Sequence, residues 1–341
     1  MTLVTDMYEL NLATSGKLKL RATARLAEGG PAATFEACVL LHEAARAERR
    51  AIEALAGCPP STRLAASIEE CWCLLEGLDL QRAAGAWGRV LREKEHVDAP
   101  TAEAMLVRLA PRFAESDRRF KKMLAGMTDL ARVRGADSFV PATAAARSAL
   151  HREVKQVLEA FPGATSFWWA SYRLLEAQGD DKGAWTALAN ARLLDPENRR
   201  FEAMSLLLSV RALPEKAADE YLGRVRGSFD DVGAEMCLMY ALAELELAKT
   251  SRPTERWTRG LDAANAGLTQ ARSEGLRKNL KATQLLLGAL LSGQEPTLDI
   301  LYLAGLGESA AVAQPRGSVR DLVTRLASRR VAAHETVDQA A

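Results

Sequence analysis

The chain has 341 residues, of which 48% are hydrophobic and 26% charged, so it holds ample apolar material for one long solenoid or two globular domains. Its formal net charge is only +1, which excludes a global field that would by itself hold nucleic acid or an anionic membrane. Aromatic residues make up 6%, and the strong helix formers Ala, Leu, Glu and Arg outnumber the β-branched residues. This composition predicts an all-α fold.

The sequence shows no pattern of a membrane span or of a secretory signal. No stretch reaches the roughly 18 apolar residues that a span needs, and Asp6 interrupts the N-terminal stretch, which lacks a continuous apolar core. The five cysteines are odd in number and lie mostly inside helical patterns, which is typical of reduced thiols. We therefore expect a cytoplasmic protein.

Residues 1–134 are interpreted as an N-terminal helical region of degenerate helix pairs. Gly29-Gly30-Pro31 predicts a turn, and Cys58-Pro59-Pro60 predicts a break. Pro111 should end or kink the helix that contains it, and Arg46 is expected on the charged side of its helix. The expected elements are one or two short helices before residue 29, then helices over 32–55, 63–76, 80–94, 101–113 and 116–134. A junction with the second half is expected at 135–142.

The clearest pattern in the second half covers residues 165–198, after a helix expected over 143–161. Two short helical patterns surround Gly179-Asp180 and end on Asp195-Pro196. Their apolar stripes have helical spacing: Trp168, Tyr172 and Leu175 in the first helix, and Ala184, Leu188 and Ala191 in the second. Pro162 precedes Pro196 by 34 residues, which is the length of one unit. A preceding unit is therefore expected to end on Pro162.

A helix–turn–helix unit of about 34 residues that ends on Pro resembles a tetratricopeptide repeat, abbreviated TPR. The resemblance implies a TPR-like helical-hairpin solenoid over residues 143–304. It also implies that the first helices of successive repeats line a concave face that binds a partner protein or peptide. The residues that would line this face are Trp169, Arg173, Glu176, Ala203 and Leu207. Tyr172 departs from the family pattern, which usually has a small residue there.

The chain continues with helical patterns and ends in a different kind of sequence. Helices are expected after Asn198 on both sides of Leu213-Pro214, and over 234–249, 255–272 and 276–291. Residues 305–317 read as a linker, because they are small, polar and Pro-containing. Residues 318–333 predict an amphipathic helix with an apolar stripe that includes Leu322, Val323 and Leu326. This helix is interpreted as a docking peptide or as a cap on the last repeat.

Sequence motifs for catalysis, metal binding or cofactor binding were not found. The four histidines are scattered, with no H-x-x-x-H and no C-x-x-C, and Cys71 and Cys73, two apart in a helix, point in different directions. There is no G-x-S-x-G nucleophile motif and no phosphate-binding Gly-rich loop. We therefore expect no enzyme activity, no metal and no cofactor, although an unrecognised all-α enzyme class remains open.

One segment is locally basic. Residues 108–155 contain eleven basic and five acidic side chains, and the candidate patch within it is Arg118, Arg119, Lys121 and Lys122. Such a face can follow a phosphate backbone or an acidic protein surface, but it is also what a solvated helix face looks like. The sequence therefore favours a scaffold or adaptor that binds another protein, with a nucleic-acid-associated helical protein as the alternative. The Ala-, Leu- and Arg-rich composition suggests a GC-rich bacterial source.

Overall fold

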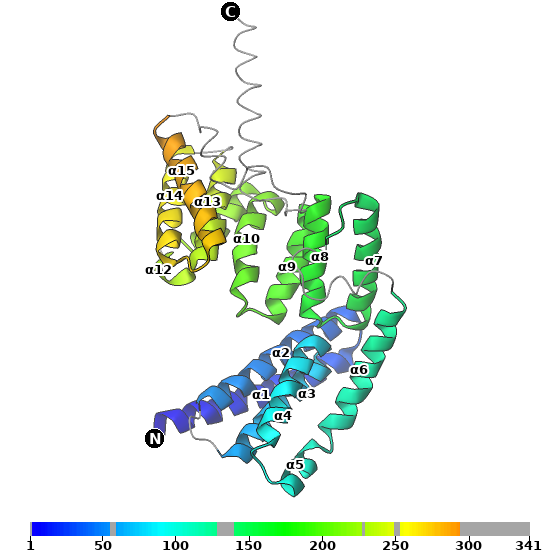
Figure 1. The fold of residues 1–341 in the computed structure, drawn as a ribbon. Helices are drawn as coiled ribbons and strands as arrows, with labels where there is room; N and C mark the ends of the chain where they lie inside the picture. Colours follow the sequence, from blue (N-terminus) through cyan, green and yellow to red (C-terminus); the bar gives the residue numbers. More distant parts are fainter. Residues whose placement is uncertain (1, 55–58, 128–139, 227–228, 249–252, 294–341) are drawn as a thin grey trace, which may run out of the picture. The chain divides into compact units, whose positions relative to one another are not determined.

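A computed structural model describes residues 2–54, 59–127, 140–226, 229–248 and 253–293 (Figure 1). Over these ranges the chain forms helices and no strand, which confirms the all-α prediction. None of the described helices is long and apolar enough to cross a membrane. The predicted linker at 305–317 and the helix at 318–333, with Leu322, Val323 and Leu326, lie outside the described residues, as does most of the predicted junction at 135–142.

The helices follow one another with short connections. The N-terminal helices are α1 (Thr2–Glu28), α2 (Pro31–Ala54), α3 (Pro60–Glu76), α4 (Leu80–Lys94), α5 (Ala99–Leu106), α6 (Leu109–Ala125) and α7 (Ala144–Ala160). The later helices are α8 (Thr165–Gln178), α9 (Asp181–Leu194), α10 (Arg199–Ala212), α11 (Glu215–Gly223), α12 (Phe229–Val232), α13 (Ala234–Leu247), α14 (Pro253–Gln270) and α15 (Glu274–Leu291). Most of these bounds match the predicted ranges to within a few residues.

The contacts divide the chain into two compact units. The first comprises Met1–Phe139, Ala145–Ser171 and Leu193–Asp195, and the second comprises Val140–Ala144, Tyr172–Arg192 and Pro196–Ala341. The chain therefore passes from one unit to the other within α8. The predicted division into regions 1–134 and 143–304 does not coincide with these units.

In the first unit, α1 packs against α2, α2 against α3 and α3 against α4, while α5 packs on α3, and α6 packs on α3 and α4 (Figure 1). The core includes side chains of α3 and α4, with Leu64, Leu74 and Val90 fully or almost fully buried. Two aromatic pairs attach α6. Trp87 of α4 stacks on Phe113 with ring centroids 5.1 Å apart, and Phe120 meets the edge of Phe161 at 5.2 Å.

Three details of the first unit correct the sequence analysis. The segment before Gly29 is one helix, because Ser15, Leu18 and Ala22 form a continuous buried stripe. Pro111 neither ends nor kinks a helix. It lies in the first turn of α6, where its missing N–H would have no partner inside the helix. Arg46 is not on a solvated face but is buried, and its guanidinium donates to the Leu194 carbonyl at 2.8 Å.

The second unit has a separate apolar core. Helix α10 packs against α13, α13 against α14, and α14 against α15. Leu222, Tyr240 and Leu287 are among its fully buried side chains. The expected stripe of Ala184, Leu188 and Ala191 in α9 is confirmed, because all three are 0% exposed.

A charged cluster lies beside that core. The Glu244 carboxylate is fully buried, and it accepts hydrogen bonds from Arg256, Arg259 and the Tyr240 hydroxyl at 2.7 to 3.2 Å. Such charge-assisted bonds are stronger than neutral ones, and they satisfy a carboxylate that would otherwise be costly to bury.

Candidate functional site

The turn between α3 and α4 holds a leucine in a backbone conformation that leucine rarely adopts. Leu78 has a φ of 56°, in the left-handed region, which costs a non-glycine residue about 1–2 kcal/mol. The backbone of the turn forms a Schellman motif. The Asp79 N–H donates to Leu74 O at 3.0 Å, and the Leu78 N–H donates to Leu75 O at 3.1 Å.

Helix α8 ends in the same way, but with a glycine at the equivalent position. There the Asp180 N–H donates to Leu175 O at 3.0 Å, and the Gly179 N–H donates to Glu176 O at 3.0 Å. Gly179 has a φ of 81°. In both turns the aspartate that follows then caps the next helix, accepting from the backbone N–H three residues on at 3.2 Å in α4 and 2.9 Å in α9. Leu78 therefore occupies a position where the matching turn has the residue best suited to it.

Contacts on both sides of the turn hold Leu78 in this conformation. Gly77 lies so close to α2 that an added Cβ would be 2.8 Å from the His42 ring, and a Cβ on Gly163 would be 1.7 Å from Gly77 O. Asp79 accepts from the Thr165 hydroxyl at 2.8 Å. The turn is thus packed between α2 and the start of α8, and a strained residue persists where its surroundings over-determine it.

His42 is a buried, neutral residue whose role is to support the turn. Its Nδ1 lies 3.3 Å from an Arg82 guanidinium nitrogen, which can only donate, so Nε2 carries the proton and donates to Gly77 O at 3.2 Å. The side chain is 0% exposed, and burial lowers its pKa, more than the nearby Asp79 raises it. A neutral histidine in this tautomer is a fixed hydrogen-bonding part of the structure.

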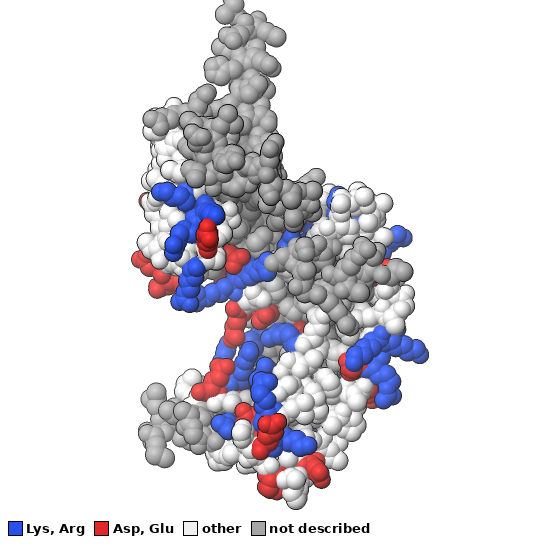
Figure 2. Space-filling model, viewed as in Figure 1, with Lys and Arg blue, Asp and Glu red and all other residues white. Residues whose placement is uncertain are grey.

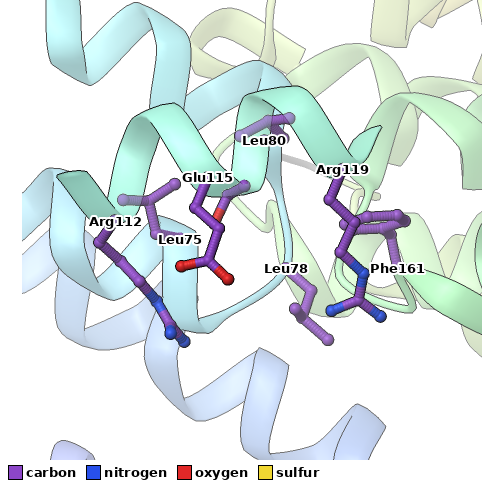
Figure 3. A pocket seen from close by; sticks show the side chains of 8 residues that line it. Leu75, Leu78, Leu80, Arg112, Glu115, Arg119 and Phe161 are labelled. Carbon is purple, nitrogen blue, oxygen red and sulfur yellow. The ribbon is translucent and has the colours of Figure 1, made fainter. Parts of the chain in front are cut away.

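Next to the turn is a small surface pocket of about 80 Å³, part of it open to solvent (Figure 3). We call it the Leu78 pocket. Its lining comes from α3, the α3–α4 turn, α4, α6 and the residue after α7: Leu75, Leu78, Leu80, Arg112, Glu115, Ser116, Arg119 and Phe161. One side is apolar. On the other side, Arg112, Glu115 and Arg119 extend from consecutive turns of α6 (Figure 3).

The charged side chains of the pocket differ in how they are engaged. Arg112 is held by Glu76 at 3.0 Å. The Arg119 guanidinium lies over the Phe161 ring, 5.6 Å from its centroid, an arrangement that fixes the side chain by a cation–π interaction. Within the described residues, neither Arg119 nor Glu115 takes part in an ion pair. Both are exposed, so each can receive a group of opposite charge from outside.

The residues of the predicted basic patch lie at the surface, but they are not equivalent. Arg118, Arg119, Lys121 and Lys122 are all exposed. Lys121 pairs with Asp117 at 2.6 Å, and only Arg119 lines the pocket. Figure 2 shows Lys and Arg side chains interspersed with Asp and Glu on the face in view. The charges on this face are therefore mixed, which weakens the field that α6 projects.

The residues predicted to line a partner-binding groove are mostly buried. Ala203 and Leu207 belong to the core of the second unit, with 0% and 3% of their surface exposed. Arg173 and Glu176 are 6% and 2% exposed, and their charged groups lie 4.0 Å apart. Trp169 is half-buried. Burial leaves little of these four side chains for a partner to contact, because α8 and α10 use these positions for packing.

Sequence reasoning did not identify Leu78, Glu115 or Phe161 as site residues. The helices expected over 63–76 and 80–94 leave residues 77–79 as their connection. The sequence Gly77-Leu78 gives no sign, however, that the leucine and not the glycine has the positive φ. The pocket also depends on α6 packing against α3 and α4, which periodicity within one helix does not predict.

Metal and thiol chemistry find no support in the described part of the chain. No group of three His, Cys, Asp or Glu side chains there is placed to hold a metal ion. Cys71 and Cys73 are fully buried, as expected of core residues, and burial raises the pKa of each thiol to about 12.

Comparisons with protein-family models, with curated proteins and with solved structures gave no match for this chain.

Proposed function

We propose that this chain is a non-catalytic binding protein of TPR-like helical hairpins, and that it binds a segment of a partner protein at the Leu78 pocket. Such a protein would act as an adaptor, a regulator or an assembly subunit in the cytoplasm. The hairpin interpretation is supported by the two turns with one hydrogen-bonding pattern and one capping aspartate, at Leu78-Asp79 and at Gly179-Asp180.

The observation that carries the proposal is the left-handed conformation of Leu78. A glycine would relieve the strain at this position, and the α8–α9 turn uses one. The leucine side chain is half-buried and lines the pocket. Strained residues cluster at ligand sites, where the surrounding structure maintains them. A leucine in this strained position is accounted for if its side chain contacts a ligand.

A polypeptide segment suits the pocket better than a small molecule does. Small-molecule sites are large and enclose most of the ligand's surface, whereas this pocket is small, partly open to solvent and has exposed charged side chains along α6. An apolar floor with a polar rim is the arrangement of protein-binding surfaces, in which one anchor side chain is buried and the rim stays wet.

The experiment that tests this function is a selection of peptides from a random phage-displayed library on the full chain, followed by affinity measurements. The two informative variants are Arg119→Glu and its matched control Arg118→Glu, which makes the same charge change one residue outside the pocket. We expect at least tenfold weaker binding for Arg119→Glu and less than twofold for Arg118→Glu. Selected peptides that bind both variants as tightly as the wild type would contradict the proposal.

The nucleic-acid alternative gives a different result in the same set of proteins. A phosphate backbone that follows the basic face of α6 would lose affinity equally with either substitution, and its binding would fall steeply with salt. A labelled single-stranded oligonucleotide, measured at low and physiological salt, tests this directly. Equal losses for the two variants would favour nucleic acid over a partner protein.

A further inference from the structure

We propose that the Leu78 pocket selects segments in which a large apolar side chain lies next to a carboxylate, so that the partner is an acidic and apolar polypeptide. This inference rests on the proposed function and specifies its partner. The apolar side chain would rest mainly against the half-buried Leu78, with the edges of Leu75 and Leu80 beside it, and the carboxylate would meet the Arg119 guanidinium.

The apolar floor is prepared for an aliphatic or aromatic side chain. Leu75, Leu80 and Phe161 are each less than 10% exposed, so their positions are fixed by the packing of the first unit. Leu78 is half-buried and held rigidly by its turn. A rigid apolar surface loses little entropy on binding, which improves affinity for a given contact area.

Arg119 is the residue that would select an acidic segment. Its guanidinium has five N–H donors and no acceptor, it is exposed, and within the described residues no ion pair occupies it. The other arginine of the pocket is already engaged, since Arg112 donates to Glu76 at 3.0 Å. Among the residues that line the pocket, Arg119 is therefore the available carboxylate receptor, and an arginine can bind a carboxylate in a bidentate manner.

Glu115 makes one end of the site negative, whereas Arg119 makes the other end positive. It lies four residues before Arg119, so the two side chains are neighbours on the same face of α6. A carboxylate placed beside Glu115 would be repelled, whereas a neutral or basic group would be tolerated there. Because the charges are opposite and one turn apart, a segment that is acidic at both ends of its apolar anchor fits less well than one that is acidic at the Arg119 end only.

The test uses three synthetic peptides that differ only in charge. Each has a central Leu-Phe in a Gly-Ser host, followed by two Glu, two Gln or two Lys residues. Binding to the full chain is measured by fluorescence anisotropy, and the site is verified by NMR of the Leu methyl groups, with Leu78→Gly used to assign the Leu78 signals. The protein variants are Arg119→Gln and the matched control Arg118→Gln.

We expect the Glu peptide to bind wild-type protein at least tenfold more tightly than the Lys peptide. This ratio should fall below threefold in Arg119→Gln and persist in Arg118→Gln. Equal binding of the three peptides at the Leu78 methyls would overturn the inference and leave the proposed function standing. A charge preference that both substitutions reduce equally would also overturn it, because the field of α6 would then be responsible. If no peptide shifts the Leu78 methyls at millimolar concentration, both the inference and the proposed function fail.

Discussion

The ionisation of Glu176 should make the protein less stable as the pH rises through neutrality. The Glu176 carboxyl is 2% exposed, and its nearest cationic groups, on Arg173 and Arg211, lie 4.0 and 3.9 Å away. Those distances are too long for hydrogen bonds. Burial therefore disfavours the charged carboxylate more than the two arginines favour it, and it raises the pKa from 4.5 to about 7.

The size of the effect follows from linkage between protonation and folding. A raised carboxyl pKa means that the folded state holds a proton that the unfolded state releases, so the associated stability is present at low pH and is lost as the pH rises through about 7. Each tenfold change in proton affinity is worth about 1.4 kcal/mol. For a pKa that moves from 4.5 to about 7, the free energy of unfolding should fall by roughly 2–3 kcal/mol between pH 5 and pH 8.

Glu176→Gln isolates this contribution, because glutamine has nearly the same shape and does not titrate. Urea unfolding of both proteins at pH 5, 6, 7 and 8 gives the difference in unfolding free energy at each pH, and other titrating groups cancel in that difference. We expect the wild type to lose about 2–3 kcal/mol relative to Glu176→Gln over this range. A difference that is constant with pH, or that changes in favour of the wild type as pH rises, would refute the reasoning.

Three further predictions concern packing and burial. Glu244→Gln should destabilise the protein by about 2–3 kcal/mol, because it removes the buried carboxylate charge that Arg256 and Arg259 share, while Arg256 keeps its ion pair with Asp219. Urea unfolding should show less than about 1 kcal/mol for the exposed control Glu255→Gln. Gly77→Ala should lower the free energy of unfolding by about 1–3 kcal/mol, because the added Cβ clashes with His42. The control Gly85→Ala in α4, where an added Cβ meets nothing within 4 Å, should raise it by about 1 kcal/mol. Equal effects of the two substitutions in urea unfolding would contradict the packing of the turn. Burial raises the thiol pKa to about 11 or 12 at four cysteines: Cys38, Cys71, Cys73 and Cys237. At pH 8, mass spectrometry should therefore find that iodoacetamide alkylates these thiols slowly in the folded protein. Alkylation as fast as in urea would disprove their burial.

Helix positions were largely predictable from sequence, because periodicity and turn residues act locally. Gly29-Gly30-Pro31 and Gly179-Asp180 end their helices where predicted. Pro111 shows the limit of a local rule: proline disrupts the interior of a helix but is accommodated in the first turn, and the sequence alone did not show where α6 begins.

The candidate site was less predictable, because it depends on contacts between helices that are distant in sequence. Arg46, Arg173 and Glu176 look like surface residues by type, yet tertiary packing buries all three. Arg119 was recognised as basic and exposed, but its position above Phe161 arises only when α6 packs near the end of α7. Local patterns do not distinguish these cases.

The most direct test of the account is the substitution Leu78→Gly, with two quantities measured on the same protein. Glycine relieves about 1–2 kcal/mol of left-handed strain but adds about 1 kcal/mol of unfolded-state entropy, so stability should be unchanged or rise by up to about 1 kcal/mol. The affinity for the Glu peptide should fall at least tenfold, because the pocket loses its half-buried leucine. If stability falls by about 2 kcal/mol and the affinity is unchanged, Leu78 is a packing residue and the pocket is not a binding site.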